Sequence, residues 1–252
     1  MYLLFAYNSY HKTIWVNGSN YTVGKFHETY SEFSDYLKLG ITNQALADEN
    51  ARLRALTQQA FYVTDTIHYV QKDTIYKQQY TYISAKVINN SVTRKNNYIT
   101  LNKGTMHGIK PDMAVISSNG ITGIVRDVSE HYCTVMSVLN WNSKISSKIK
   151  KNEYFGSTIW DGNSPDLASL IDIPIHAPVE IGDSIVTSEF STIFPEGILI
   201  GTVAKTGKID ESFKDIKIKL ATNFRKVSYV YVITNQFKEE RDSLERRLPV
   251  DR

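Results

Sequence analysis

The sequence predicts a mainly β protein, with an N-terminal coiled-coil helix followed by two small β-barrel subdomains. Between residues 84 and 235, short apolar segments alternate with turns that contain glycine or proline, a pattern typical of barrels and sandwiches. The alternation of strands with helices that a parallel α/β fold requires is missing from this region. Residues 23–60, by contrast, contain no proline and repeat their apolar positions with helical spacing.

These patterns divide the chain of 252 residues, which is long enough to bury a sizeable core, into consecutive segments. We expect the possible end of a membrane helix (1–7), a linker (8–22), the coiled-coil helix (23–60), connecting strands (61–83), the first barrel subdomain (84–152), the second barrel subdomain (153–235) and a charged tail (236–252). The pattern leaves open whether strands near the C-terminus also join the first barrel.

The first seven residues, Met-Tyr-Leu-Leu-Phe-Ala-Tyr, are apolar but few. A membrane-spanning helix needs about 20 apolar residues. A secretory signal needs a basic start and a small-residue cleavage site, and both are missing here. Two interpretations stay open: an N-terminal strand or buried plug, or the last turns of a membrane helix that begins before this sequence. In the second interpretation the membrane stub consists of Tyr2, Leu3, Leu4 and Phe5.

A heptad pattern in the helical segment predicts self-association. Leu39, Leu46 and Leu53 recur every seven residues, as the d positions of a coiled coil do. The a positions are then Tyr36, Asn43, Asn50 and Thr57. Glu49 at g and Arg54 at the following e would pair across a parallel homodimer. The alternative is a single amphipathic helix that packs on its own domain.

Glycines in the β region indicate that one strand unit is used twice. The segment Gly120-Ile-Thr-Gly123-Ile-Val returns in variant form as Gly197-Ile-Leu-Ile-Gly201-Thr-Val. Glycine permits turns with positive φ and close approach of neighbouring chains, so the sequence predicts barrel corners at these positions. The predicted barrel-turn residues are Gly104, Gly108, Gly120, Gly123, Gly182, Pro195, Gly197 and Gly201.

Residue patterns typical of a reaction centre, a metal site or a cofactor site are missing from the sequence. The net charge of +3 comes from scattered Lys and Arg, so nucleic acid is not an expected partner. The histidines and acidic residues lack paired ligand spacing, and glycine-rich nucleotide loops are missing. Cys133 is the single cysteine, which excludes an internal disulfide. We therefore predict no catalytic residue, no metal and no cofactor.

Three segments carry a resemblance to a known family. They are Asn43-Gln-Ala-Leu46-Ala-Asp-Glu49-Asn50-Ala-Arg-Leu53; then Asn102-Lys-Gly104, Gly108-Ile109, Met113-Ala-Val and Gly120-Ile-Thr-Gly123-Ile-Val; and, most specific, Ile181-Gly182-Asp183-Ser-Ile-Val186-Thr-Ser188 followed by Ile193-Phe194-Pro195-Glu-Gly197-Ile-Leu-Ile-Gly201. Over nearly its whole length the chain is similar to the MreC family of bacterial rod-shape-determining proteins. The family often has glycine where this chain has Glu189, which suggests either a turn of different geometry or variation within the family.

The resemblance implies a single-pass protein of the bacterial inner membrane, with most of the chain in the periplasm. It implies a non-enzymatic scaffold of the cell-elongation machinery, the elongasome, which maintains cell shape by organising and activating peptidoglycan synthesis enzymes. The implied partners are a second copy of the chain, further copies in higher self-assembly, the class B penicillin-binding transpeptidase of elongation, MreB, MreD and RodA. We expect assembly through exposed edge strands and apolar grooves.

Two other functions fit parts of the sequence. Gly182-Asp183-Ser184 is similar to part of a serine-hydrolase nucleophile loop, which would suit a cell-wall hydrolase with its site in a barrel cleft. However, Ile185 and Val186 follow, in place of the glycines that leave room for an oxyanion hole. The second alternative is a generic periplasmic adaptor or adhesion module with the same architecture.

Overall fold

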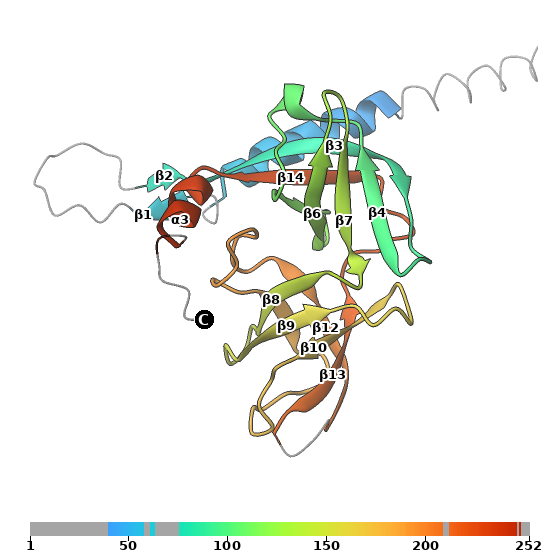
Figure 1. The fold of residues 1–252 in the computed structure, drawn as a ribbon, viewed down its shortest axis with the longest axis vertical. Helices are drawn as coiled ribbons and strands as arrows, with labels where there is room; N and C mark the ends of the chain where they lie inside the picture. Colours follow the sequence, from blue (N-terminus) through green and yellow to red (C-terminus); the bar gives the residue numbers. More distant parts are fainter. Residues whose placement is uncertain (1–39, 58–60, 64–75, 209–211, 246, 248–252) are drawn as a thin grey trace, which may run out of the picture. The chain divides into compact units, whose positions relative to one another are not determined.

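Two antiparallel sheets close on themselves into barrels in this chain (Figure 1). The computed structural model describes residues 40–57, 61–63, 76–208, 212–245 and 247. Residues 47–252 form one compact unit, and the packing given below belongs to that unit. The predicted mainly β fold, with a short helix before two barrels, is confirmed.

The first barrel has six strands in the order β14-β3-β4-β7-β6-β5, each antiparallel to its neighbours. The strands are β3 (Tyr80–Asn90), β4 (Asn96–Leu101), β5 (Ala114–Ile116), β6 (Ile121–Val128), β7 (Cys133–Asn140) and β14 (Tyr229–Asn235). A 3-10 turn, η2 (Thr105–His107), lies between β4 and β5. Because Tyr80 pairs with Asn235, the chain enters and leaves this barrel at one corner.

The second barrel is an insertion in the first. Its strand order is β10-β13-β12-β11-β8-β9, again antiparallel throughout. The strands are β8 (Lys144–Ile149), β9 (Phe155–Ile159), β10 (Leu167–Ile171), β11 (Ser184–Thr187), β12 (Leu199–Lys208) and β13 (Lys214–Leu220). The chain passes into this barrel after Asn140 and returns to the first barrel after Leu220.

This arrangement differs from the predicted subdomain limits of 84–152 and 153–235. Strand β8 closes the second barrel although it lies before the predicted limit, and β14 closes the first barrel, which is the possibility that the sequence pattern left open for strands near the C-terminus. β-branched residues occur in the strands of both barrels. The sequence pattern therefore marks where a strand is, whereas the pairing that closes each barrel is decided by contacts between distant segments.

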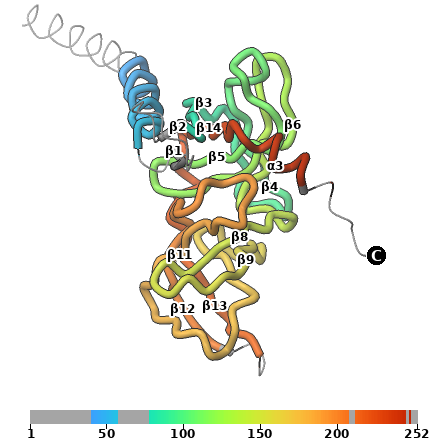
Figure 2. The backbone as a smooth tube through the Cα atoms, turned by 90° about the vertical axis from the view of Figure 1, so that its left-hand side faces the viewer, coloured from blue at the N-terminus to red at the C-terminus, as the bar shows by residue number. Residues whose placement is uncertain are grey.

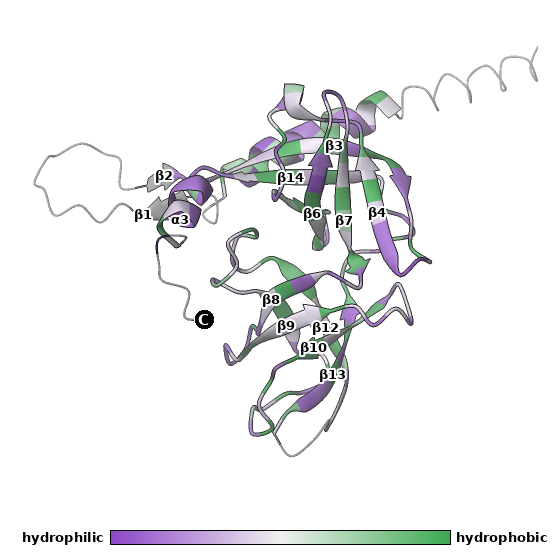
Figure 3. Cartoon of the chain, viewed as in Figure 1, coloured by the Kyte–Doolittle hydropathy of each residue, from purple (hydrophilic) through white to green (hydrophobic). Residues whose placement is uncertain are grey.

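Alternation along the strands divides the side chains between two cores. On β14, Val230 and Val232 belong to the interior cluster of the first barrel. Tyr231 and Ile233 point the other way and belong to a larger cluster that continues into the second barrel. Figure 3 shows the resulting change between hydrophobic and hydrophilic residues along the barrel strands. Cys133 is buried in the first cluster, where desolvation raises the pKa of its thiol to about 11.

Gly123 and Gly201 lie inside β6 and β12 and not in the predicted barrel turns, and both allow close contact between strands. A Cβ atom on Gly123 of β6 would overlap the carbonyl oxygen of Met136 on β7, and a Cβ atom on Gly201 of β12 would overlap that of Lys219 on β13. In each copy a neighbouring strand approaches too closely for a side chain. Positive φ angles are found at Gly108, which ends η2, at Gly182 before β11, and at Gly197 in the loop between β11 and β12.

The two barrels are closed, so their strands have no free edges through which copies or partners could assemble. All strands of both barrels have neighbours on both sides, and a closed barrel has no edge to offer. The expectation of exposed edge strands is therefore wrong for the two barrels. In the predicted connecting region, β1 (Phe61–Val63) and β2 (Tyr76–Gln78) form a separate two-stranded sheet. Contacts made by the barrels must use side chains and loops.

Helices flank the β region. Residues 40–55 are α-helical, and within the predicted charged tail the helix α3 (Lys238–Glu245) follows β14 (Figure 2). The Lys110–Glu239 ion pair, at 2.8 Å, ties α3 to the first barrel. Residues 1–39, which contain the predicted membrane stub, the linker and the start of the coiled coil, lie outside the described residues. Among the described residues, no helix has the length and apolar character needed to cross a membrane.

Substitution of Gly120 tests whether the close contact between Gly120 of the first barrel and Leu199 of the second barrel stabilises the fold. Its Cβ position is occupied by the carbonyl oxygen of Leu199 in the second barrel, with Ala221 close by. We expect Gly120→Ala to lower the free energy of unfolding by about 1–3 kcal/mol in urea titrations. As a control, a Cβ atom on Gly207 of β12 would meet nothing nearer than 3.9 Å, so Gly207→Ala should change stability by less than about 0.5 kcal/mol. Equal losses would contradict this explanation.

Candidate interaction surfaces

The helix packs one side against the first barrel through small residues. Ala47 and Ala51 are each only 5% exposed and, being four residues apart, lie on one side of the helix. Asp48 accepts a hydrogen bond from the Ser84 hydroxyl of β3. The sequence left open that the helix packs on its own domain. The side with Ala47 and Ala51 does so.

Arg54 reinforces the same contact. Its guanidinium lies 5.0 Å from the ring centroid of Tyr231, a cation–π geometry, and donates to the Ser118 carbonyl oxygen at 3.1 Å. The predicted pairing of Arg54 with Glu49 of a second copy would compete with these contacts within the chain.

Another side of the helix, and the turn that follows it, expose leucines. We call Leu46, Leu53 and Leu56 the leucine face. Leu46 and Leu53 are each 50% exposed and Leu56 is 67% exposed. The other predicted heptad residues of the described helix, Asn43, Glu49 and Asn50, are also exposed. Leu53, a d position of the heptad, is thus exposed, whereas Ala47 and Ala51 are buried. Tyr36 and Leu39 lie outside the described residues.

A second surface lies on the second barrel and combines two aromatic rings with acidic side chains. Phe155 and Phe190 meet edge to face, with ring centroids 4.7 Å apart, yet they are 39% and 62% exposed. Beside them, Glu153, Glu189 and Glu196 converge on Lys148. We call these two rings and three carboxylates the aromatic–acidic patch. Exposed aromatic side chains are typical of contact surfaces between proteins.

Lys148 organises the acidic part of this patch. Its side chain is only 7% exposed, and its Nζ atom lies 2.6 Å from Glu196, 3.1 Å from Glu189 and 3.5 Å from Glu153. The hydrogen bond to Glu196, together with Glu189, raises the pKa of Lys148 above its ordinary value and outweighs the opposing effect of burial. One buried ammonium thus holds three carboxylates, which leaves the surface of the patch negatively charged.

The loop between β11 and β12 carries most of these residues and is well fixed. Thr187 Oγ1 donates to the Pro195 carbonyl oxygen at 2.6 Å, and Phe194 is buried at 3% exposure. Glu189 does not have a positive φ, so its backbone accommodates a side chain where the family often has glycine. Sequence reasoning missed Lys148 and the aromatic pair. These residues and the three carboxylates come from separate parts of the chain, so no local spacing of residues indicates the patch.

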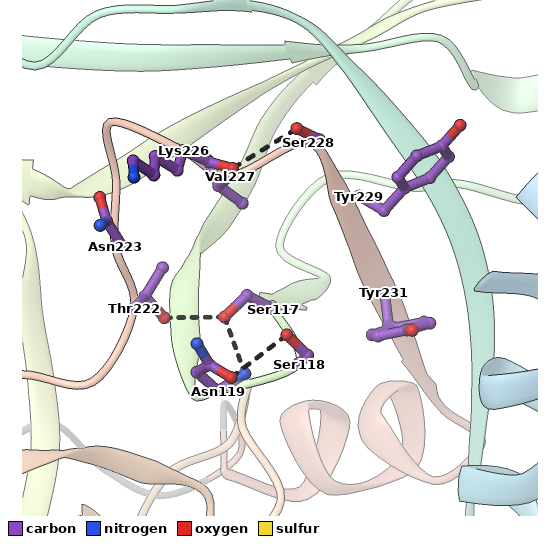
Figure 4. Close-up of a pocket in the computed structure, with 10 residues that line it drawn as sticks. All are labelled: Ser117, Ser118, Asn119, Thr222, Asn223, Lys226, Val227, Ser228, Tyr229 and Tyr231. Atoms are coloured by element: carbon purple, nitrogen blue, oxygen red, sulfur yellow. Dashed lines mark hydrogen bonds between the residues drawn. The ribbon is translucent and has the colours of Figure 1, made fainter. Parts of the chain in front are cut away.

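A polar pocket lies where the segment that returns from the second barrel after Leu220 meets the turn between β5 and β6 of the first barrel (Figure 4). Its volume is about 390 Å³. We call it the seam pocket, and its lining residues are Ser117, Ser118, Asn119, Thr222, Asn223, Lys226, Val227, Ser228, Tyr229 and Tyr231. At its floor the Ser117 and Thr222 hydroxyls are 2.9 Å apart, and Thr222 also donates to the Ile121 carbonyl oxygen at 2.7 Å.

The residues named for a hydrolase do not come together. Ser184 begins β11, and among the described residues no hydrogen bond joins its hydroxyl to a histidine. His176 packs its ring against Tyr154, with ring centroids 5.9 Å apart. Among the residues that the structure describes, no group of three or more His, Cys, Asp or Glu residues has the geometry to hold a metal ion.

Two closed barrels, one inserted in the other and joined to a helix with an exposed leucine face, define a double-barrel protein whose described surfaces suit contact with other proteins. Residues 87–234 match the family described as "Rod shape-determining protein MreC, barrel core". That match covers more than half of the chain, so the chain belongs to the MreC family, as the sequence resemblance predicts.

Relatives with known names agree with this assignment. The cell shape-determining protein MreC of Listeria monocytogenes is 30% identical over 131 residues, which are 51% of this chain and 44% of that protein. The Escherichia coli protein of the same name is 23% identical over 202 residues, 79% of this chain and 49% of that protein. The chain therefore spans about half the length of these curated relatives.

Solved structures show the same fold. The structure of Listeria monocytogenes MreC is 26% identical, with a TM-score of 0.58 over 81% of this chain and 92% of that one. The crystal structure of MreC from Pseudomonas aeruginosa is 20% identical, with a TM-score of 0.57 over 60% of this chain and 98% of that one. A complex between the penicillin-binding protein PBP2 and MreC from Helicobacter pylori matches at 17% identity and a TM-score of 0.51, over 63% and 99%.

The charge cluster around Lys148 predicts a pH effect. In the folded chain, a hydrogen bond from its own backbone N–H and the contact with Lys148 lower the pKa of Glu189 below its ordinary value of 4.5. Its ionised form therefore stabilises the fold above that value, and this contribution is lost as the pH falls through the lowered pKa. We expect Glu189→Gln to lose less stability than the parent between about pH 5 and pH 3 in urea titrations.

The matched control for this prediction is Glu130→Gln, which changes an exposed glutamate of the first barrel. This control should follow the parent curve throughout. Parallel acid curves for the parent and Glu189→Gln would show that the Lys148 contact does not lower the pKa of Glu189.

Proposed function

We propose that this chain is a non-enzymatic scaffold of the bacterial cell-elongation machinery, which maintains cell shape by organising and activating enzymes of peptidoglycan synthesis. The observation that carries the proposal is membership of the MreC family over the barrel core. The relatives named above are called cell shape-determining proteins. Exposed leucines and an exposed aromatic–acidic patch on rigid barrels support a role in holding other proteins.

The partner we infer for the aromatic–acidic patch is the class B penicillin-binding transpeptidase of elongation. The relative from Helicobacter pylori forms a complex with a penicillin-binding protein, which supports the choice of partner. Because the barrels are closed, the contact must use side chains, and the Phe155–Phe190 pair supplies apolar area on a fixed base. The three carboxylates around Lys148 favour a partner segment that carries Lys or Arg.

We further propose a homodimer through the leucine face. The helix already uses its alanine side on the first barrel, so a second copy would bind on the leucine side without displacing that packing. Burial of Leu53 and Leu56, now 50% and 67% exposed, would supply the driving force. A parallel pair of such helices would bring the barrels of two copies side by side, which suits a single-pass protein of the inner membrane with its barrels in the periplasm.

MreB, MreD and RodA are the further partners that we propose for this assembly. Higher self-assembly of the dimers would extend it.

Sedimentation tests the dimer. We expect the parent chain to sediment as a dimer at micromolar concentration, and Leu46→Asp combined with Leu53→Asp to sediment as a monomer, because two carboxylates cannot be buried in the seam. The helix also carries a control position: Arg52 is exposed but lies at heptad position c, so Arg52→Glu should leave the dimer intact. A monomer for parent and variant alike would contradict the proposed dimer.

Binding to the periplasmic part of the elongation transpeptidase tests the patch. We expect Phe190→Ser to weaken binding by at least about tenfold in calorimetry, because an exposed aromatic ring at the centre of a contact carries much of its energy. Tyr132, which is 51% exposed and belongs to the first barrel, provides the matched variant Tyr132→Ser, which should bind as the parent does. Equal affinity of all three proteins would place the partner on another surface.

A further inference from the structure

The seam pocket has a lining unlike that of most small-molecule sites. Such sites are usually apolar with a few polar groups, whereas nine of the ten lining residues here carry a polar side-chain group and only Val227 does not. The volume of about 390 Å³ lies within the range of ligand sites. We propose that the seam pocket binds a short acidic saccharide. This inference goes beyond the scaffold role and does not depend on it.

The hydroxyl and amide groups of the lining match the chemistry of a sugar. Each sugar hydroxyl both donates and accepts a hydrogen bond, and the lining offers groups of the same double character. The Ser118 and Ser228 hydroxyls donate only long hydrogen bonds within the chain, at 3.3 and 3.4 Å, so a ligand can replace these two bonds at low cost. Asn119 and Asn223 are exposed and bring an amide donor and an amide acceptor each. The set favours a ligand that has several hydroxyl groups.

The charge of the pocket favours an acidic sugar over a neutral one. Lys226 is the charged residue of the described lining, and no Asp or Glu is among the residues that form the described wall. The Arg54 guanidinium adds positive charge nearby, since it donates to the Ser118 carbonyl oxygen. A carboxylate on the ligand would meet only positive charge there, and a charge-assisted hydrogen bond is stronger than a neutral one.

The floor of the pocket is fixed before any ligand arrives. Ser117 and Thr222 are 6% and 4% exposed and bond to each other. Ser117 Oγ also accepts from the backbone N–H groups of Asn119 and Gly120, both at 3.2 Å. This turn therefore loses little conformational freedom when a ligand binds, which lowers the cost of binding.

The probes for the test are a hyaluronan disaccharide, which is acidic, and chitobiose, which is a neutral disaccharide, with inorganic phosphate as a third arm. Affinities for the full chain are measured by ligand-observed NMR titration. We expect the acidic disaccharide to bind about threefold more tightly than chitobiose, the ratio that one exposed ion pair supplies. Lys226→Ala should remove that preference, and Asn119→Ala should weaken both saccharides. Lys150→Ala, at an exposed lysine of the second barrel, should change neither.

Three outcomes overturn the proposal. The first is that neither disaccharide binds the parent chain. The second is that phosphate binds as tightly as the acidic disaccharide and competes with it, which would show a site for charge alone. The third is that the acidic disaccharide binds Lys226→Ala and Asn119→Ala as it binds the parent, which would place its site elsewhere. None of these results bears on binding of the transpeptidase, so the scaffold proposal and the saccharide proposal fail independently.

Discussion

The hydroxyl group of Thr222 fixes the segment that returns from the second barrel to the first barrel, and the position of the aromatic–acidic patch depends on that junction. It connects the segment that returns from the second barrel to Ser117 and to the Ile121 carbonyl oxygen of the first. Beside it, Ala221 N–H donates to the Ile200 carbonyl oxygen at 3.0 Å. Only two short segments connect the barrels, so these buried hydrogen bonds and the apolar cluster around them hold the second barrel in place. The aromatic–acidic patch therefore has a fixed base.

Much of the fold could be predicted from the sequence, because alternation and turn glycines are local signals. Gly123 and Gly201 mark equivalent strands in the two barrels, and each leaves room for a neighbouring carbonyl group. The assignment of β8 to the second barrel could not be predicted, and that of β14 to the first barrel stayed open, because the strands of both barrels carry similar residues. Lys148 could not be found either, since the loop that covers it comes from a distant part of the chain. Such contacts exist only after folding.

For the helix at residues 40–55, the spacing of apolar residues predicts the helix but not which of its sides packs on the barrel. Leu46 and Leu53, which are seven residues apart, are exposed on the described helix, whereas hydrophobicity alone would have placed apolar side chains on the barrel. The structure places Ala47 and Ala51 there instead. Alanine allows the helix axis to approach closely, and Arg54 can then reach across to Tyr231. Small residues thus decide which side faces the sheet, and the leucines stay on the outside.

The shared corner of β3 and β14 has a mechanical consequence. Since Tyr80 pairs with Asn235, the chain segments before and after the core leave it next to each other. A force that draws those two segments apart would open the β3–β14 pair one hydrogen bond at a time, while the second barrel, which is inserted at two points far along the chain, would carry almost no load. The second barrel would therefore keep its shape while the β3–β14 pair opens.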